Sequence, residues 1–151
     1  MKRGFMGSAL VERLMGIEKI AVLGAGQMGN GIAQVAACAG YDVTMIDIKQ
    51  EYVDKGLAAI ENSLARVVKK ERMTAEEAAN ALARVKIATD KSAAADADLV
   101  VEAIPEIPDL KFSTFAELDQ ICKPEAILAS NTSSISINAI AAATSRPDRV
   151  I

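Results

Sequence analysis

Residues 17–40 read IEKIAVLGAGQMGNGIAQVAACAG, and they carry the clearest indication of the fold. Residues 17–23 are a short aliphatic run, typical of a strand buried on both faces. A G-x-G-x-x-G pattern follows at Gly24, Gly26 and Gly29, and a helical stretch extends from about Met28 to residue 39. Gly40 lies where the end of a helix favours a positive φ. A strand, a glycine turn and a helix in succession predict the first unit of a parallel α/β sheet.

The glycine pattern predicts a dinucleotide site. Gly24 allows a tight turn, Gly26 lets the backbone approach a pyrophosphate, and Gly29 lets the helix pack closely on the strand. The first turn of the helix then offers unpaired N–H groups and a partial positive charge to the phosphates. We therefore expect the whole loop to bind the cofactor: Gly24, Ala25, Gly26, Gln27, Met28 and Gly29.

Asp47 ends the next predicted strand, 18 residues after Gly29, where such folds place an acid that binds ribose. Its carboxylate is suited to accept hydrogen bonds from the adenine-ribose hydroxyls of NAD and to repel the 2′-phosphate of NADP. NAD is therefore the expected cofactor, although the positive charge of Lys49 nearby works against the exclusion of NADP. A second interpretation, compatible with the first, makes Asp47 the N-cap of the following helix with Gln50 at the capping-box position.

The rest of the chain alternates aliphatic runs with longer helical patterns. Strands are expected at about 42–47, 85–89, 98–104 and 126–130, and further helices at about 50–71, 74–84, 108–122 and 136–143. Thr74 and Glu77 form a capping box, and Pro108 suits the first turn of a helix. The alternation predicts a doubly wound parallel sheet, the Rossmann fold, with a helical pair inserted after the second strand. Residues 149–151 resemble a sixth strand cut short, so we expect one domain over 17–151 after a disordered leader, residues 1–16.

Composition excludes several classes of function. The 151 residues contain no histidine, which excludes His-ligated zinc and a Ser-His-Asp triad within this chain. A net charge of −3 gives no general attraction to nucleic acid, and no apolar run approaches the ~18 residues of a membrane helix. Cys38 and Cys122 are far apart in sequence, and we expect both to be reduced core thiols of a cytoplasmic protein.

Three further motifs resemble one enzyme family. They are VVEAIPE at residues 100–106, Lys111, and SNTSS at residues 130–134. Together with GAGQMGNGIAQ they resemble the 3-hydroxyacyl-CoA dehydrogenases, over residues 17 to 151. The resemblance implies oxidation of (S)-3-hydroxyacyl-CoA to 3-oxoacyl-CoA with NAD, or the reverse, in a longer protein of β-oxidation or butanoate metabolism. It also implies a homodimer formed through a C-terminal helical domain that this chain lacks.

The resemblance also implies site residues. Ala103, Glu106 and Lys111 match positions that line the nicotinamide half of NAD, and Ser133 matches the serine that contacts both the cofactor and the 3-oxygen of the substrate. A local surface ion pair is the alternative interpretation of Glu106 and Lys111. For Ser133, the residues alone favour a helix cap, and only the family pattern favours the contact to the substrate. Ser63 and Lys70 match contacts to CoA, within a local basic cluster formed by Arg66, Lys69, Lys70 and Arg72.

The general base is missing from the chain. Family members continue from R-V-I to a histidine, which is expected three positions past Ile151. We therefore expect this chain to hold NAD and part of the CoA, and to be inactive alone. The alternatives are another Rossmann dehydrogenase acting on β-hydroxyacids, and a non-catalytic NAD-binding module.

Overall fold

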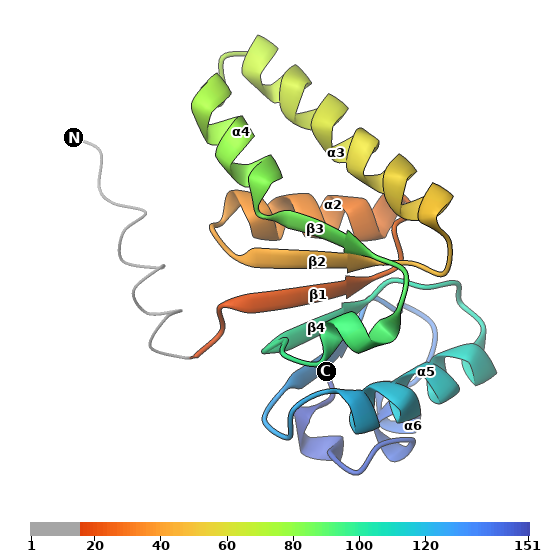
Figure 1. The fold of residues 1–151 in the computed structure, drawn as a ribbon. Helices are drawn as coiled ribbons and strands as arrows, with labels where there is room; N and C mark the ends of the chain where they lie inside the picture. Colours follow the sequence, from red (N-terminus) through yellow and green to blue (C-terminus); the bar gives the residue numbers. More distant parts are fainter. Residues whose placement is uncertain (1–15) are drawn as a thin grey trace.

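The structure, a computed structural model, describes residues 16–151 (Figure 1). Five parallel strands form one sheet in the order β3-β2-β1-β4-β5. The strands are β1 (Lys19–Leu23), β2 (Asp42–Ile46), β3 (Val85–Ala88), β4 (Leu99–Glu102) and β5 (Ile127–Ser130). The helices are α2 (Gln27–Cys38), α3 (Gln50–Lys69), α4 (Ala75–Ala83), α5 (Pro108–Ile121) and α6 (Ile137–Ala142), with the short 3-10 turns η1 (Lys91–Ala94) and η2 (Pro147–Arg149). The doubly wound fold is confirmed; the expected leader, apart from Gly16, lies outside the described residues.

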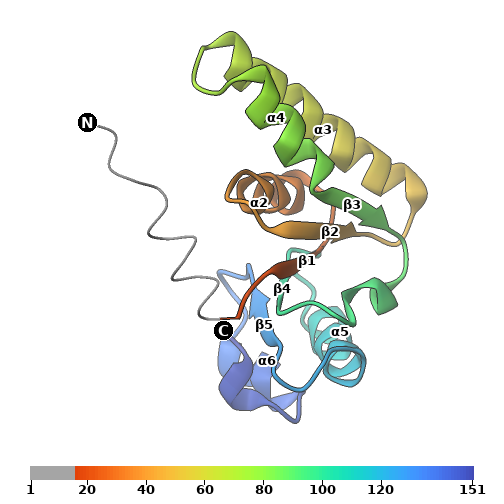
Figure 2. The ribbon, with the colours of Figure 1, turned by 60° about the vertical axis from the view of Figure 1, so that its left-hand side comes forward.

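Helices cover both faces of the sheet, as the aliphatic strands require. Along β1, Ile20 and Val22 face a core shared with α2, α3 and α4, while Ala21 and Leu23 face a second core shared with α5 and α6. Figures 1 and 2 show these two helical layers on opposite sides of the strands. Among residues 16–151, no helix is both long enough and apolar enough to cross a membrane.

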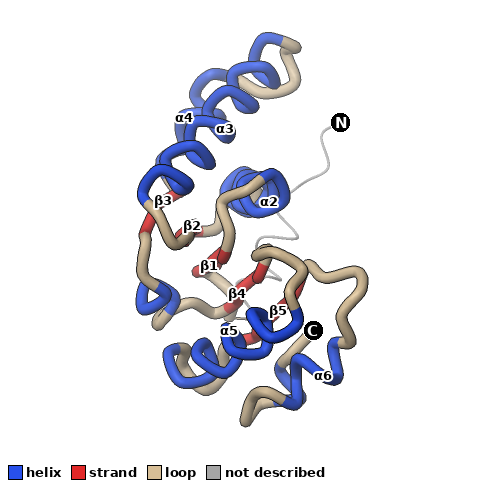
Figure 3. The backbone as a smooth tube through the Cα atoms, turned by 90° about the vertical axis from the view of Figure 1, so that its right-hand side faces the viewer, coloured by secondary structure: helices blue, strands red, loops and turns tan. Residues whose placement is uncertain are grey.

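The strand order places the ligand edge. β1 pairs with β2 on one side and with β4 on the other, so the chain reverses its direction of winding between β1 and β4. Leu23, the last residue of β1, pairs with Ile46 of β2 and with Glu102 of β4, so β1, β2 and β4 end at the same level. Figure 3 looks onto this carboxyl edge, where the loops after β1, β2, β4 and β5 meet. Parallel α/β sheets bind ligands in the crevice at such a switch point.

The inserted helical pair α3 and α4 is present, and local signals explain its ends. Arg72 N–H donates to the carbonyl of Val67 and Glu71 N–H to that of Val68, which is a Schellman motif with Glu71 at a φ of 55°. The Thr74–Glu77 capping box that begins α4 has both of its hydrogen bonds, at 2.8 and 3.1 Å.

Other details correct or refine the expectations. Cys122 is buried, but Cys38 is exposed, so its assignment to the core is wrong. The reason is that α2 buries a narrow stripe of Gly29, Ala33, Ala36 and Ala37, and Cys38 lies one step beyond it. At the end of the chain, Val150 pairs in parallel with Leu128 of β5, which agrees with the beginning of a sixth strand.

Candidate functional site

A cleft of about 880 Å³ opens at the carboxyl edge of the sheet. Its volume lies within the roughly 300–1,000 Å³ typical of small-molecule sites. Of the site residues expected from sequence, the cleft is lined by Gly24, Gly26, Gln27, Met28, Asp47, Ala103, Glu106, Lys111 and Ser133. The lining also includes residues that the sequence did not single out: Leu23, Ile46, Ile48, Tyr52, Thr89, Lys91, Ile104, Pro105, Leu110, Thr114 and Asn131.

The three glycines of the loop are required for different reasons. A Cβ on Gly24, whose φ is 100°, would lie 2.5 Å from the carbonyl oxygen of Ala103. A Cβ on Gly29 would lie 1.8 Å from the carbonyl oxygen of Gly24, so helix α2 can contact the loop this closely only through glycine. Gly26 has no neighbour within 4 Å of its hypothetical Cβ, and it is exposed to the cleft. The fold does not need a glycine there, whereas a close-approaching ligand does.

The first turn of α2 suits a bound phosphate. Gly26 is the N-cap of α2 and supplies no capping side chain, and the first turn contains no acidic residue. The helix therefore presents amide N–H groups and the positive end of its dipole without internal competition. This open, uncapped cradle fits the pyrophosphate of a dinucleotide.

Asp47 is held in place by backbone amides. Its Oδ2 accepts from Ala25 N at 2.8 Å and its Oδ1 from Ile48 N at 2.7 Å. It does not cap α3, contrary to the second interpretation: the N-cap is Lys49, with no side-chain capping bond, because both Asp47 oxygens are directed to other amides. Each carboxylate oxygen can accept a further hydrogen bond, so Asp47, on the cleft wall, retains capacity for ribose hydroxyls.

At the other end of the cleft, Lys111 joins two carboxylates. Its Nζ donates to Glu106 Oε1 at 2.5 Å and to Glu102 Oε2 at 2.9 Å. The expected local ion pair between Glu106 and Lys111 is therefore present, and Glu106 is half-exposed. Lys111 itself is fully buried rather than on the surface, because α5 points this residue inward. Lys111 foremost, then Thr132 and Ser134, lower the pKa of Glu106 to about 2, which keeps Glu106 ionised.

Glu102 is the functional candidate that the sequence reasoning passed over. It is the last residue of β4 and is completely buried. Its carboxylate accepts from Ile104 N at 2.8 Å and from Ser130 Oγ at 2.6 Å, besides Lys111. The available signal was a glutamate ending an otherwise aliphatic strand, since an unpaired charge is rarely placed there.

Ser133 lies on the exposed wall of the cleft, after β5. It does not cap α6, because Ser136 is the N-cap and accepts from Ala139 N at 3.4 Å. The helix-cap interpretation of Ser133 is therefore wrong, and within residues 16–151 its hydroxyl has no protein partner.

The expected CoA contacts lie on α3, outside the lining of the cleft. Ser63 is half-buried, and Lys70 is exposed at the C-cap of the helix. The structure does not bring these two residues together with the nucleotide loop, but the basic cluster around Lys70 is exposed to solvent.

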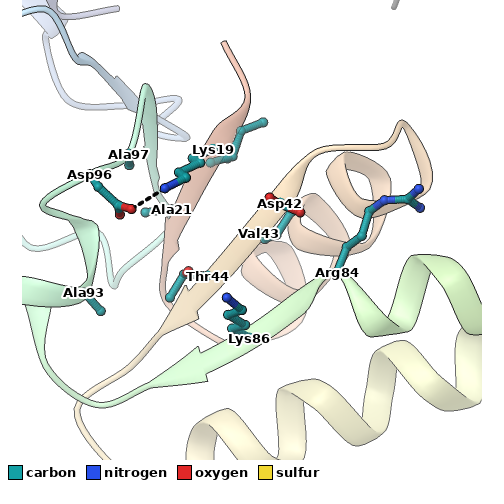
Figure 4. A pocket seen from close by; sticks show the side chains of 11 residues that line it. Lys19, Ala21, Asp42, Val43, Thr44, Arg84, Lys86, Ala93, Asp96 and Ala97 are labelled. Carbon is teal, nitrogen blue, oxygen red and sulfur yellow. Dashed lines mark hydrogen bonds and ion pairs between the residues drawn. The ribbon is translucent and has the colours of Figure 1, made fainter.

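A second hollow, of about 80 Å³, lies near the amino ends of β1, β2 and β3 (Figure 4). Lys19 and Asp96 pair at 2.6 Å beside it, and Asp42, Thr44 and Lys86 also line it. The hollow is too small for a dinucleotide, and it lies away from the switch point, so the large cleft is the candidate site.

Residues 19–151 match the model of the family described as 3-hydroxyacyl-CoA dehydrogenase, NAD binding domain. The chain belongs to this family. A 3-hydroxybutyryl-CoA dehydrogenase of Bradyrhizobium diazoefficiens is 50% identical over 135 residues, which are 89% of this chain and 46% of that protein. A probable 3-hydroxybutyryl-CoA dehydrogenase of Deinococcus radiodurans is 51% identical over 133 residues, 88% of this chain and 48% of that protein.

A solved structure agrees with the family assignment. The (S)-3-hydroxybutyryl-CoA dehydrogenase of Ralstonia eutropha superimposes with a TM-score of 0.87 at 47% identity, covering 89% of this chain and 48% of that one. This 3-hydroxyacyl-CoA dehydrogenase domain thus spans about half the length of the relatives it matches. The alternative of a different Rossmann family is wrong, because the family model covers the sheet, the glycine loop and the Ser133 segment together.

Proposed function

We propose that this domain supplies the NAD site and part of the acyl-CoA site of an enzyme that interconverts (S)-3-hydroxyacyl-CoA and 3-oxoacyl-CoA. One observation carries the proposal: a single cleft joins the open glycine loop and Asp47 at one end to Lys111, Glu106 and Ser133 at the other. The Ser133 hydroxyl has no partner within residues 16–151. The first end suits a dinucleotide, and the second suits a reacting oxygen beside it.

Each end has a proposed role. The N-terminus of α2 holds the pyrophosphate, and Asp47 binds the adenine ribose and disfavours NADP by charge repulsion. Ala103, Glu106 and Lys111 line the nicotinamide half. Ser133 donates a hydrogen bond to the 3-oxygen of the substrate, where negative charge develops during oxidation.

The reaction also needs a base. A bound NAD+ would supply the acceptor for the hydride of C3, and the proton of the 3-hydroxyl would have to pass to a base. Ser133 cannot serve, because an unactivated hydroxyl is too weak a base near neutral pH, and the 151 residues contain no histidine. We propose that the base comes from outside this chain, so that the chain alone binds NAD without turning over substrate.

The basic end of α3 supports an acyl-CoA partner. Arg66, Lys69, Lys70 and Arg72 are all exposed, on a chain whose net charge is −3. Such a cluster attracts the phosphates of CoA, and Ser63 lies seven residues before Lys70 on the same helix. We propose, with the resemblance, that the whole protein is a cytoplasmic homodimer of β-oxidation or butanoate metabolism.

Two measurements test the proposal. The chain should bind NADH in a fluorescence titration, and should show no oxidation of NADH with acetoacetyl-CoA above background. Turnover within a few-fold of a full-length relative would show that the base has been misplaced. The absence of histidine favours the alternative of a non-catalytic NAD-binding module, and a protein extended past Ile151 tests that alternative. Dehydrogenase activity of the extended protein would contradict it if Ser133→Ala lowers that activity by roughly 100-fold or more, the cost of one lost oxyanion donor.

A further inference from the structure

Two fully buried charges lie at the wall of the cleft, Lys111 in its lining and Glu102 behind it. The side chains of Glu102 and Lys111 are both completely excluded from solvent, and they pair at 2.9 Å. Taking a carboxylate and an ammonium out of water costs more than a well-packed apolar pair would, so stability alone is a weak reason for such an arrangement. We therefore consider which segments of the site the Glu102–Lys111 pair holds in position.

Glu102 fixes three different segments at once. Through Oε2 it accepts from Lys111 Nζ of α5 and from Ile104 N in the loop after β4, and through Oε1 it accepts from Ser130 Oγ at the end of β5. It is thus hydrogen-bonded to a helix, to the loop after β4 and to the last residue of β5, from which the Ser133 loop begins.

From Glu102, two hydrogen-bonded routes lead to Glu106 on the cleft wall. The first runs through Lys111, whose Nζ also donates to Glu106 Oε1 at 2.5 Å. The second runs through Ser130, whose Oγ accepts from Thr132 N at 3.2 Å. Thr132 Oγ1 in turn donates to Glu106 Oε2 at 2.7 Å.

The second route also surrounds Ser133. Ser133 lies between Thr132, which is held as above, and Ser134, whose Oγ donates to Glu106 Oε2 at 2.8 Å. The hydroxyl of Ser133 is therefore left unpartnered within residues 16–151 while both of its neighbours are fixed. Such preorganisation lowers the cost of ordering the loop when a ligand binds.

We propose that Glu102 is a positioning residue for the nicotinamide half of the site: its buried carboxylate fixes Lys111 and Ser130, and through them Glu106 and the Ser133 loop. This inference rests on the proposed function, because it takes NAD as the ligand of the cleft. Glu102 itself is not part of the lining and is expected to touch neither cofactor nor substrate.

The test compares two ligands on the chain as it is. ADP-ribose has the adenosine, pyrophosphate and second ribose of NADH but lacks the nicotinamide, so it keeps the contacts to the glycine loop and Asp47 and loses those to the nicotinamide ring. For Glu102→Gln, which removes the charge and keeps the shape, we expect the affinity for NADH to fall about tenfold. The affinity for ADP-ribose should change less than twofold. A merely structural role lowers the melting temperature without such a split between the ligands.

Two other variants complete the experiment. Asp98→Asn is the matched control, because Asp98, like Glu102, pairs with a lysine, Lys123, and accepts from the backbone, from Glu18 N and Lys19 N, but at the opposite edge of the sheet. It should lower the melting temperature and leave both affinities unchanged. Ser130→Ala removes only the route through Ser130, and it should lower the affinity for NADH several-fold while leaving that for ADP-ribose nearly unchanged. This variant tests the proposal if Glu102→Gln does not fold.

The outcomes separate the two proposals. Equal losses for both ligands, or a change in melting temperature alone, overturn the positioning role while leaving the cofactor site in place. A wild-type chain that binds neither NADH nor ADP-ribose overturns the proposed function and the positioning role with it.

Discussion

The glycine loop offers a sharp test, because three glycines within six residues are expected to respond differently to the same added methyl group. Gly26→Ala meets no protein atom within 4 Å, and the φ of −69° at Gly26 is allowed for alanine. Its cost in stability should stay under about 1 kcal/mol, the scale of an N-cap change. The methyl group projects into the space of the cofactor, so binding should suffer instead.

The expected loss of binding follows from the chemistry of the loop. If the methyl group prevents one amide from reaching a phosphate oxygen, a hydrogen bond to a charged group worth about 1.5–3 kcal/mol is lost. That corresponds to a fall in NADH affinity of roughly ten- to a hundredfold. Fluorescence titration with NADH measures it directly, with circular dichroism to confirm that the variant is folded.

Two glycines of α2, Gly29 and Gly31, separate folding from binding. Gly29→Ala places a Cβ 1.8 Å from the Gly24 carbonyl oxygen, an overlap that the loop has to relieve by moving. Overpacking of this kind costs about 1–3 kcal/mol or more, which lowers the melting temperature by roughly 2–12 °C. Gly31→Ala, in the same helix with nothing within 4 Å, should stabilise by about 0.5–1 kcal/mol and leave NADH binding unchanged. A Gly26→Ala variant that binds NADH as tightly as the wild type would refute this account of the loop.

Three further perturbations test other parts of the structure. Glu71→Gly should raise the free energy of unfolding, measured by denaturant titration, by about 0.5–1 kcal/mol, because it relieves a φ of 55°. Gly40→Ala should lower the same free energy by about 1 kcal/mol, because it places a Cβ at a φ of 100° after α2. Arg146→Met should cost about 3–5 kcal/mol, because it leaves the buried Asp119 carboxylate without the Arg146 Nε at 2.7 Å; an unchanged melting temperature would contradict this. The pKa of Glu106 is lowered to about 2, chiefly by Lys111, so its ionised form stabilises the fold fully above about pH 4.5 and progressively less as the pH falls toward 2. The difference in melting temperature between wild type and Glu106→Gln should therefore be constant above pH 4.5 and shrink below it.

Local signals in the sequence predicted the fold well. The glycine loop, the aliphatic strands and the capping box at Thr74 each depend on neighbouring residues, and the structure confirms all three. Asp47 was expected to end the second strand and lies directly after β2, one residue beyond it. Its partner Ala25 is 22 residues away, and no local pattern distinguishes that contact from a helix cap.

The sequence did not predict the buried network of Glu102, Lys111 and Ser130. Glu102 and Ser130 are 28 residues apart and meet only because β4 and β5 are adjacent in the sheet. The burial of Lys111 depends equally on how α5 packs beneath the cleft, and lysine is normally a surface residue. Such contacts are set by tertiary structure, whereas hydrophobic periodicity and capping residues report only on single elements.

The most direct test of the central claim is a parallel titration of this chain with NADH and NADPH. Asp47 on the cleft wall should repel the 2′-phosphate, so we expect NADH to bind at least about tenfold more tightly, a difference of roughly 1.4 kcal/mol. Asp47→Ala should weaken the binding of NADH by about 1–2 kcal/mol and reduce the difference in affinity between NADH and NADPH. Equal or tighter binding of NADPH to the wild-type chain would contradict the account.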